Sequence, residues 1–77
     1  MAIVTSLIKD EREFRSLHPT ELVAKYIIAE CDGKKVLQLN TYGSKNRDNP
    51  EKLSQTLQFD EHSAQELFNV LAQEFGL

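Results

Sequence analysis

The end of the chain has the hydrophobic pattern of a helix. Its apolar residues recur at spacings of three and four, the period of one helix face. They are Ala64, Leu67, Phe68, Leu71, Ala72 and Phe75. Asp60 stands where a helix N-cap is expected, and Gly76 follows the last apolar residue. The pattern predicts an amphipathic helix over residues 60–75, whose apolar stripe packs on a sheet or takes part in a dimer contact.

Residues 20–42 have a different pattern, in which apolar and polar residues alternate on both sides of Asp32-Gly33. This pair is typical of a two-residue type I′ hairpin turn, where both central residues need a positive φ. Such a turn pairs Cys31 with Lys34 and Ala24 with Thr41. It gives one apolar face, with Leu22, Ala24, Tyr26, Ile28, Leu37 and Leu39. The other face is mixed, with Val23, Lys25, Ile27, Gln38, Asn40 and Tyr42.

A helix competes with the first of these strands. Leu22, Val23, Tyr26 and Ile27 also lie at helical spacing, and Thr20 is placed to cap them. We favour the strand, because a hairpin also explains the run that follows and because β-branched and aromatic residues are frequent here.

Residues 53–59 alternate as well, with Leu57 and Phe59 expected in the core and Thr56 and Gln58 on the opposite face. The sequence therefore predicts a single α+β domain over residues 1–77: a curved antiparallel sheet of three or four strands followed by a C-terminal amphipathic helix. The strands fall in residues 20–59. Residues 1–18 are expected to be partly irregular, with a possible first strand near the N-terminus and with Phe14 and Leu17 as anchors of the connecting segment.

The size of the chain adds an expectation about its assembly. A chain of 77 residues buries only about 60% of its unfolded surface, so a homodimer is predicted.

The apolar run at the N-terminus is too short for a signal sequence or a membrane span. Cys31 is the single cysteine and is expected to be a half-buried strand residue in a reducing compartment. These features predict a cytoplasmic protein without a membrane partner.

The residues offer little for catalysis. His18 and His62 have no acidic or cysteine partner at a motif spacing, and the loop after Tyr42 lacks the spacing of a phosphate-binding loop. We therefore expect no enzyme activity, no metal or cofactor, and no small-molecule substrate.

Binding of nucleic acid is better supported by the residue types. The net charge is −3, but the acidity lies in the C-terminal segment, so a local positive surface in the middle of the chain is compatible with the overall sign. The expected polar face combines amides, hydroxyls, a lysine and an aromatic ring, as single-stranded nucleic acid requires. Three basic residues of the adjoining loop could contact phosphates. They are Lys45, Arg47 and Lys52.

From Val36 onward the sequence resembles the single-stranded-DNA-binding domain of the positive cofactor four family of transcriptional coactivators and its small bacterial relatives. The resemblance consists of an alternating strand that ends at Tyr42, a polar loop with a proline, a short strand at residues 57–59 and an amphipathic C-terminal helix. The chain departs from the family in its loop, where "DNPEKLSQ" has Lys52 as its one basic residue, and in the helix, where Ala64 lies near the family's tryptophan. The family's basic strand residue is Asn40 here.

The resemblance implies binding of single-stranded DNA or RNA without base specificity, as a transcription or DNA-metabolism accessory factor. Tyr42 would stack on bases, and Lys25, Lys45, Arg47 and Lys52 would meet phosphates. Gln38, Asn40 and Gln58 would donate and accept hydrogen bonds. The alternative is a small dimeric protein-interaction or regulatory module with no nucleic-acid ligand.

Overall fold

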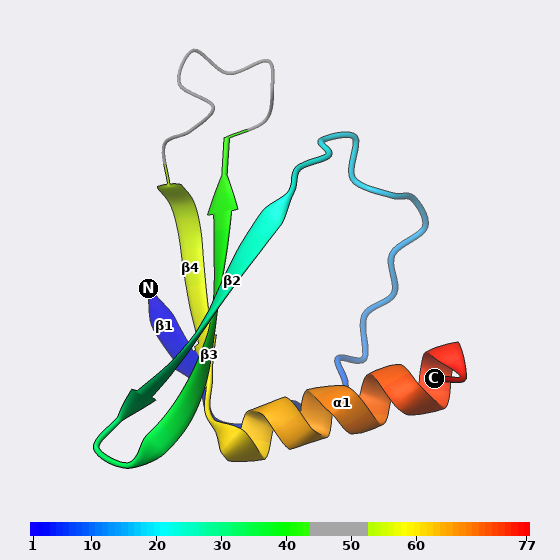
Figure 1. Cartoon of the computed structure of the whole chain (residues 1–77). Coiled ribbons are helices and arrows are strands. Elements are labelled where there is room, and N and C mark those ends of the chain that lie inside the picture. Colours follow the sequence, from blue (N-terminus) through cyan, green and yellow to red (C-terminus); the bar gives the residue numbers. More distant parts are fainter. Residues whose placement is uncertain (44–52) are drawn as a thin grey trace.

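The structure, a computed structural model, describes residues 1–43 and 53–77. It contains β1 (Ala2–Val4), β2 (Ala24–Cys31), β3 (Lys34–Tyr42), β4 (Leu53–Phe59) and the helix α1 (Glu61–Phe75) (Figure 1). The strands form one sheet in the order β1-β4-β3-β2. This arrangement confirms the predicted α+β class. β1 runs parallel to β4 while the other neighbours are antiparallel, so the sheet is mixed.

The hairpin has the predicted turn and register. Asp32 and Gly33 both have positive φ, 54° and 75°. The strands pair from Cys31 with Lys34 to Ala24 with Thr41. The competing helix is therefore excluded. Because β2 begins only at Ala24, Leu22 and Val23, which the sequence placed on the two faces, precede the strand.

Residues 5–23 form no helix or strand. Phe14 and Leu17 are highly exposed, so they do not anchor this segment as expected. The segment is tied down near its start instead. The Ser63 hydroxyl donates a 2.6 Å hydrogen bond to the Val4 carbonyl, and the Leu7 N–H donates to a Glu66 carboxylate oxygen at 3.3 Å. These two contacts hold the N-terminal segment against the first half of α1.

The helix begins and ends with the predicted caps. The Asp60 carboxylate accepts a 2.8 Å hydrogen bond from the Ser63 N–H, and Gly76 adopts a left-handed conformation with φ 69°. This hydrogen bond holds the pKa of Asp60 below its usual range. Beyond its first turns, α1 points away from the sheet rather than lying across a face (Figure 1).

The core is accordingly small. Phe59, which is 5% exposed, is the one buried apolar side chain among the described residues. Leu57, expected in the core, is 39% exposed, and Phe68 and Phe75 of the helix stripe are largely exposed. The Cys31 side chain is also exposed rather than half-buried. No helix in the described part of the chain is long and apolar enough to cross a membrane.

Candidate functional site

Strand register gathers the predicted polar side chains on one face of the sheet. Lys25 of β2 lies opposite Asn40 of β3, and Asn40 lies opposite Thr56 of β4. Gln38 and Gln58 form the next pair along β3 and β4. Paired residues in a sheet project to the same side, so these positions share a face. We call it the polar face, and it comprises Lys25, Gln38, Asn40, Tyr42, Thr56 and Gln58.

The amides and the hydroxyl of this face form a continuous hydrogen-bonded chain. Gln58 Nε2 donates to Gln38 Oε1 at 2.9 Å, and Gln38 Nε2 donates to Asn40 Oδ1 at 3.0 Å. Thr56 Oγ1 donates to the same Asn40 oxygen at 3.2 Å. Asn40, at 6% exposure, is the most buried member. We call these four hydrogen-bonded side chains, Gln58, Gln38, Asn40 and Thr56, the amide chain. Because each group orients its neighbour, the amide chain holds its remaining polar atoms in fixed directions.

Tyr42 joins this face at its end, where the pairing of β3 with β4 shifts between Thr41 and Tyr42 so that Tyr42 pairs with Leu53. The Lys25 ammonium lies over the Tyr42 ring, 5.1 Å from its centroid, within cation–π range. The structure thus brings together a cation, an aromatic ring and the amide chain. The loop part of the predicted site, with Lys45, Arg47 and Lys52, lies outside the described residues.

Sequence reasoning missed one member of this region. Ile3 of β1 lies opposite Gln58, so it extends the same face with an apolar side chain. Ile27, recognised as part of the mixed face, pairs with Gln38 and lies on the same face, at the β2 edge. The amide chain is therefore bordered by two half-exposed isoleucines. Nothing local in the sequence signals the place of Ile3, because a parallel pairing between residues 2–4 and 57–59 depends on the whole fold.

In the rest of the chain that the structure describes, the titratable residues form no comparable cluster. His62 Nε2 lies 3.0 Å from a Glu66 carboxylate oxygen one helical turn away, an acidic partner that the motif spacings did not reveal. Within residues 1–43 and 53–77, no group of three or more His, Cys, Asp or Glu side chains is arranged to hold a metal ion.

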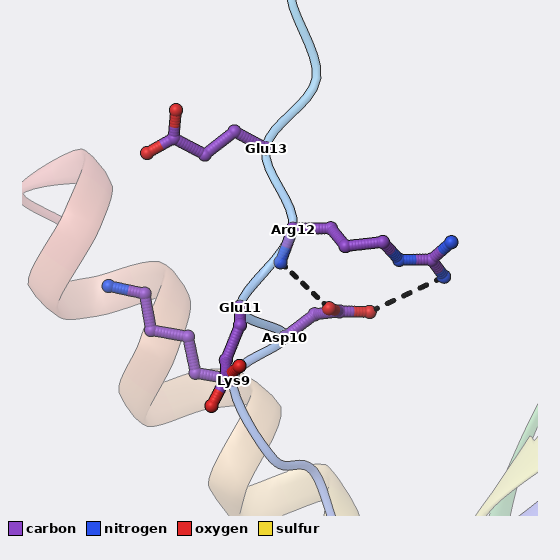
Figure 2. A pocket seen from close by; sticks show the side chains of 5 residues that line it. All are labelled: Lys9, Asp10, Glu11, Arg12 and Glu13. Atoms are coloured by element: carbon purple, nitrogen blue, oxygen red, sulfur yellow. Dashed lines mark hydrogen bonds and ion pairs between the residues drawn. The ribbon is translucent and has the colours of Figure 1, made fainter.

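A shallow concave spot lies beside α1 (Figure 2). It is lined by five consecutive residues, 9–13. Asp10 accepts a 2.9 Å hydrogen bond from the Arg12 N–H and lies 3.7 Å from its guanidinium. Both side chains are well exposed, so this bend is a solvated local turn and its ion pair contributes little to stability.

Comparison of the chain with known protein families, with curated proteins and with solved structures finds no match. The resemblance to the positive cofactor four family therefore stays a prediction.

Proposed function

We propose that this protein binds single-stranded nucleic acid, without base specificity, through the polar face. The observation that carries the proposal is the joint placement of Lys25, Tyr42 and the amide chain on one side of the sheet. Non-specific binding of single strands uses positive charge along the backbone and aromatic rings on which bases stack. The Lys25 and Tyr42 pair supplies both within one contact.

Tyr42 is the proposed stacking residue. A planar ring has two sides, and the Lys25 ammonium lies over one of them. A base would stack on the ring while the ammonium meets the adjoining phosphate. Stacking of this kind contributes about 1 to 3 kcal/mol per base, whereas one exposed lysine in contact with phosphate contributes mainly to the salt dependence of binding. Stacking on Tyr42 therefore contributes more to the proposed affinity than the Lys25 charge does.

The amide chain is the proposed hydrogen-bonding surface. In the part of the chain that the structure describes, the Asn40 side-chain nitrogen and the Gln58 side-chain oxygen make no hydrogen bond to another residue. Asn40 is only 6% exposed, so of the two it is the half-buried Gln58 that can meet a sugar or base, as an acceptor through its side-chain oxygen. Because the hydrogen bonds of the amide chain already fix these side chains, little conformational entropy is lost when a ligand binds.

The proposed role is one of binding rather than catalysis, in a cytoplasmic setting that suits an exposed single cysteine. The experiment is a fluorescence anisotropy titration of labelled single-stranded and duplex oligonucleotides of equal length, at two salt concentrations. We expect the single strand to bind more tightly than the duplex. The logarithm of affinity should fall with the logarithm of salt concentration with a slope of about −0.7 per phosphate contact. If neither oligonucleotide binds at low salt, the proposal fails and a protein-interaction module becomes the better explanation.

A further inference from the structure

A half-exposed isoleucine lies on the polar face, on the same strand as Lys25. Ile27 is two residues from Lys25 on β2, and side chains two residues apart on a strand project to the same side of the sheet. Its pairing with Gln38 agrees, because Gln38 belongs to the polar face. β2 is an edge strand, and Ile27 is 50% exposed. The polar face therefore includes an open apolar position at its β2 edge.

Along the direction of the strands, Lys25 lies between Tyr42 and Ile27. Lys25 pairs with Asn40, which is two residues from Tyr42 on β3. Ile27 pairs with Gln38, two residues from Asn40 in the other direction. The Lys25 ammonium lies 5.1 Å from the centre of the Tyr42 ring. At about 3.4 Å per residue, Lys25 and Ile27 are about 7 Å apart along β2. An aromatic ring, a cation and an apolar side chain therefore follow one another along this edge of the face.

This order matches the repeat of a nucleic-acid strand, in which one phosphate separates two neighbouring bases. When one base stacks on Tyr42 and the adjoining phosphate meets Lys25, the next base along the strand comes to the position of Ile27. Every base has a flat π-face, and apolar side chains of nucleic-acid-binding proteins also pack against bases. An isoleucine at this position can therefore cover the face of a base.

We propose that Ile27 is a second base contact of the polar face and packs against the base next to the one on Tyr42, across the phosphate at Lys25. This inference rests on the proposed function and extends it from one base to a dinucleotide unit. It requires no base specificity, because contact with the flat face of a base does not read its hydrogen-bonding edge. A base suits the position better than an apolar protein side chain does, because Lys25 and Gln38 beside it are polar and a base has polar edges as well as apolar faces.

β2 itself provides a matched control. Ile28 is the next residue on the strand and is 51% exposed, compared with 50% for Ile27. Neighbouring side chains on a strand point to opposite faces, so Ile28 lies on the side of the sheet away from the polar face. Truncation of either isoleucine changes the same strand by the same atoms. A difference between the two variants in ligand binding therefore reports on the face and not on the strand.

The test is the affinity of Ile27→Ala and Ile28→Ala for a labelled single-stranded oligonucleotide, by fluorescence anisotropy. We expect Ile27→Ala to weaken binding by about threefold to tenfold, because less apolar surface is covered by a base. The salt slope should stay unchanged, because no phosphate contact is lost. Ile28→Ala should bind as the wild type does. Ile27→Tyr should bind more tightly than the wild type, because a ring offers a larger stacking surface. Equal affinities of the two alanine variants, or no gain from Ile27→Tyr, would overturn the second base contact.

A nuclear magnetic resonance measurement on the wild type tests the contact without a substitution. On addition of a thymidine dinucleotide at millimolar concentration, the methyl signals of Ile27 should shift and those of Ile28 should remain in place. Unmoved Ile27 signals at saturation would also overturn the contact.

The results separate this inference from the proposed function. If the wild type binds and Tyr42→Ala weakens binding while Ile27→Ala does not, the function stands and the second contact is wrong. If the wild type binds no single strand at low salt, both fail.

Discussion

The Lys25 ammonium lies 5.1 Å from the centre of the Tyr42 ring, on the diagonal between β2 and β3. The two side chains would act on different parts of a nucleic acid, so substitutions can separate them. Lys25→Gln should reduce the salt slope of single-strand binding by about 0.7, because one phosphate contact is lost. Tyr42→Ala should cost about 1 to 3 kcal/mol of binding free energy and leave the slope nearly unchanged.

Lys35→Gln is the control for charge. Lys35 of β3 pairs with Glu30 of β2 and is exposed. Because side chains alternate along a strand, Lys35 lies on the side of the sheet opposite the polar face. Its neutralisation should change neither the slope nor the affinity by much. The assignment is contradicted if Lys35→Gln and Lys25→Gln have the same effect in anisotropy titrations at several salt concentrations.

The second prediction concerns Asn40, which accepts hydrogen bonds from Gln38 and Thr56 while nearly buried. Asn40→Ala removes the shared acceptor and leaves both donors without it. We expect a loss of about 1 to 3 kcal/mol in the free energy of unfolding, measured by urea denaturation. Asn69→Ala, at an exposed asparagine of α1, should change it by less than about 0.5 kcal/mol. Equal effects would mean that the amide chain contributes nothing particular to stability.

The third prediction concerns the hairpin turn. A Cβ at Gly33 would meet no atom within 4 Å, so a substitution there acts through the backbone alone. Gly33→Val should destabilise the domain by about 1 to 2 kcal/mol, because a β-branched residue resists the observed φ of 75°. Gly33→Asn should cost much less, because asparagine tolerates this conformation. Thermal unfolding of the two variants side by side tests the turn, and equal melting temperatures would contradict it.

The elements predicted correctly are those that local chemistry determines. Asp32-Gly33 fixes the turn and therefore the register, which in turn places Lys25, Gln38 and Asn40 on one side of the sheet. The caps at Asp60 and Gly76 fix the ends of α1 in the same way. Each of these features depends on residues close together in the sequence, so a pattern can reveal it.

The features that were missed depend on contacts between distant parts of the chain. A first strand near the N-terminus was expected, but the parallel pairing of β1 with β4 was not; the Ser63 hydrogen bond to Val4 joins the end of this strand to α1. The same contact and the one between Leu7 and Glu66 join the first half of α1 to the N-terminal segment. The helix stripe correctly predicted an amphipathic helix. It could not show that Phe68 and Phe75 remain exposed within one chain, because periodicity does not identify what covers an apolar face.

The fourth prediction is a pH dependence at the helix start. The hydrogen bond from the Ser63 N–H lowers the pKa of Asp60 in the folded state below the usual 3.8. A carboxyl with a lowered folded pKa contributes stability that is complete above its unfolded pKa and is lost as pH falls through the folded value. The wild type should therefore lose stability below about pH 3.8 relative to Asp60→Asn, whose amide caps the helix without titrating. A difference in melting temperature that is constant from neutral to acidic pH would contradict this role.

The most direct test of the central claim, that the polar face binds nucleic acid, is a nuclear magnetic resonance titration of the ¹⁵N-labelled protein with a single-stranded oligonucleotide. The side-chain amide signals of Gln38, Asn40 and Gln58 report on the polar face, and those of Gln65, Asn69 and Gln73 on α1 provide an internal control. We predict that the first group shifts progressively to saturation while the second remains in place. Saturating binding that leaves the first group unchanged, or that moves the helix amides instead, would contradict the assignment of the polar face.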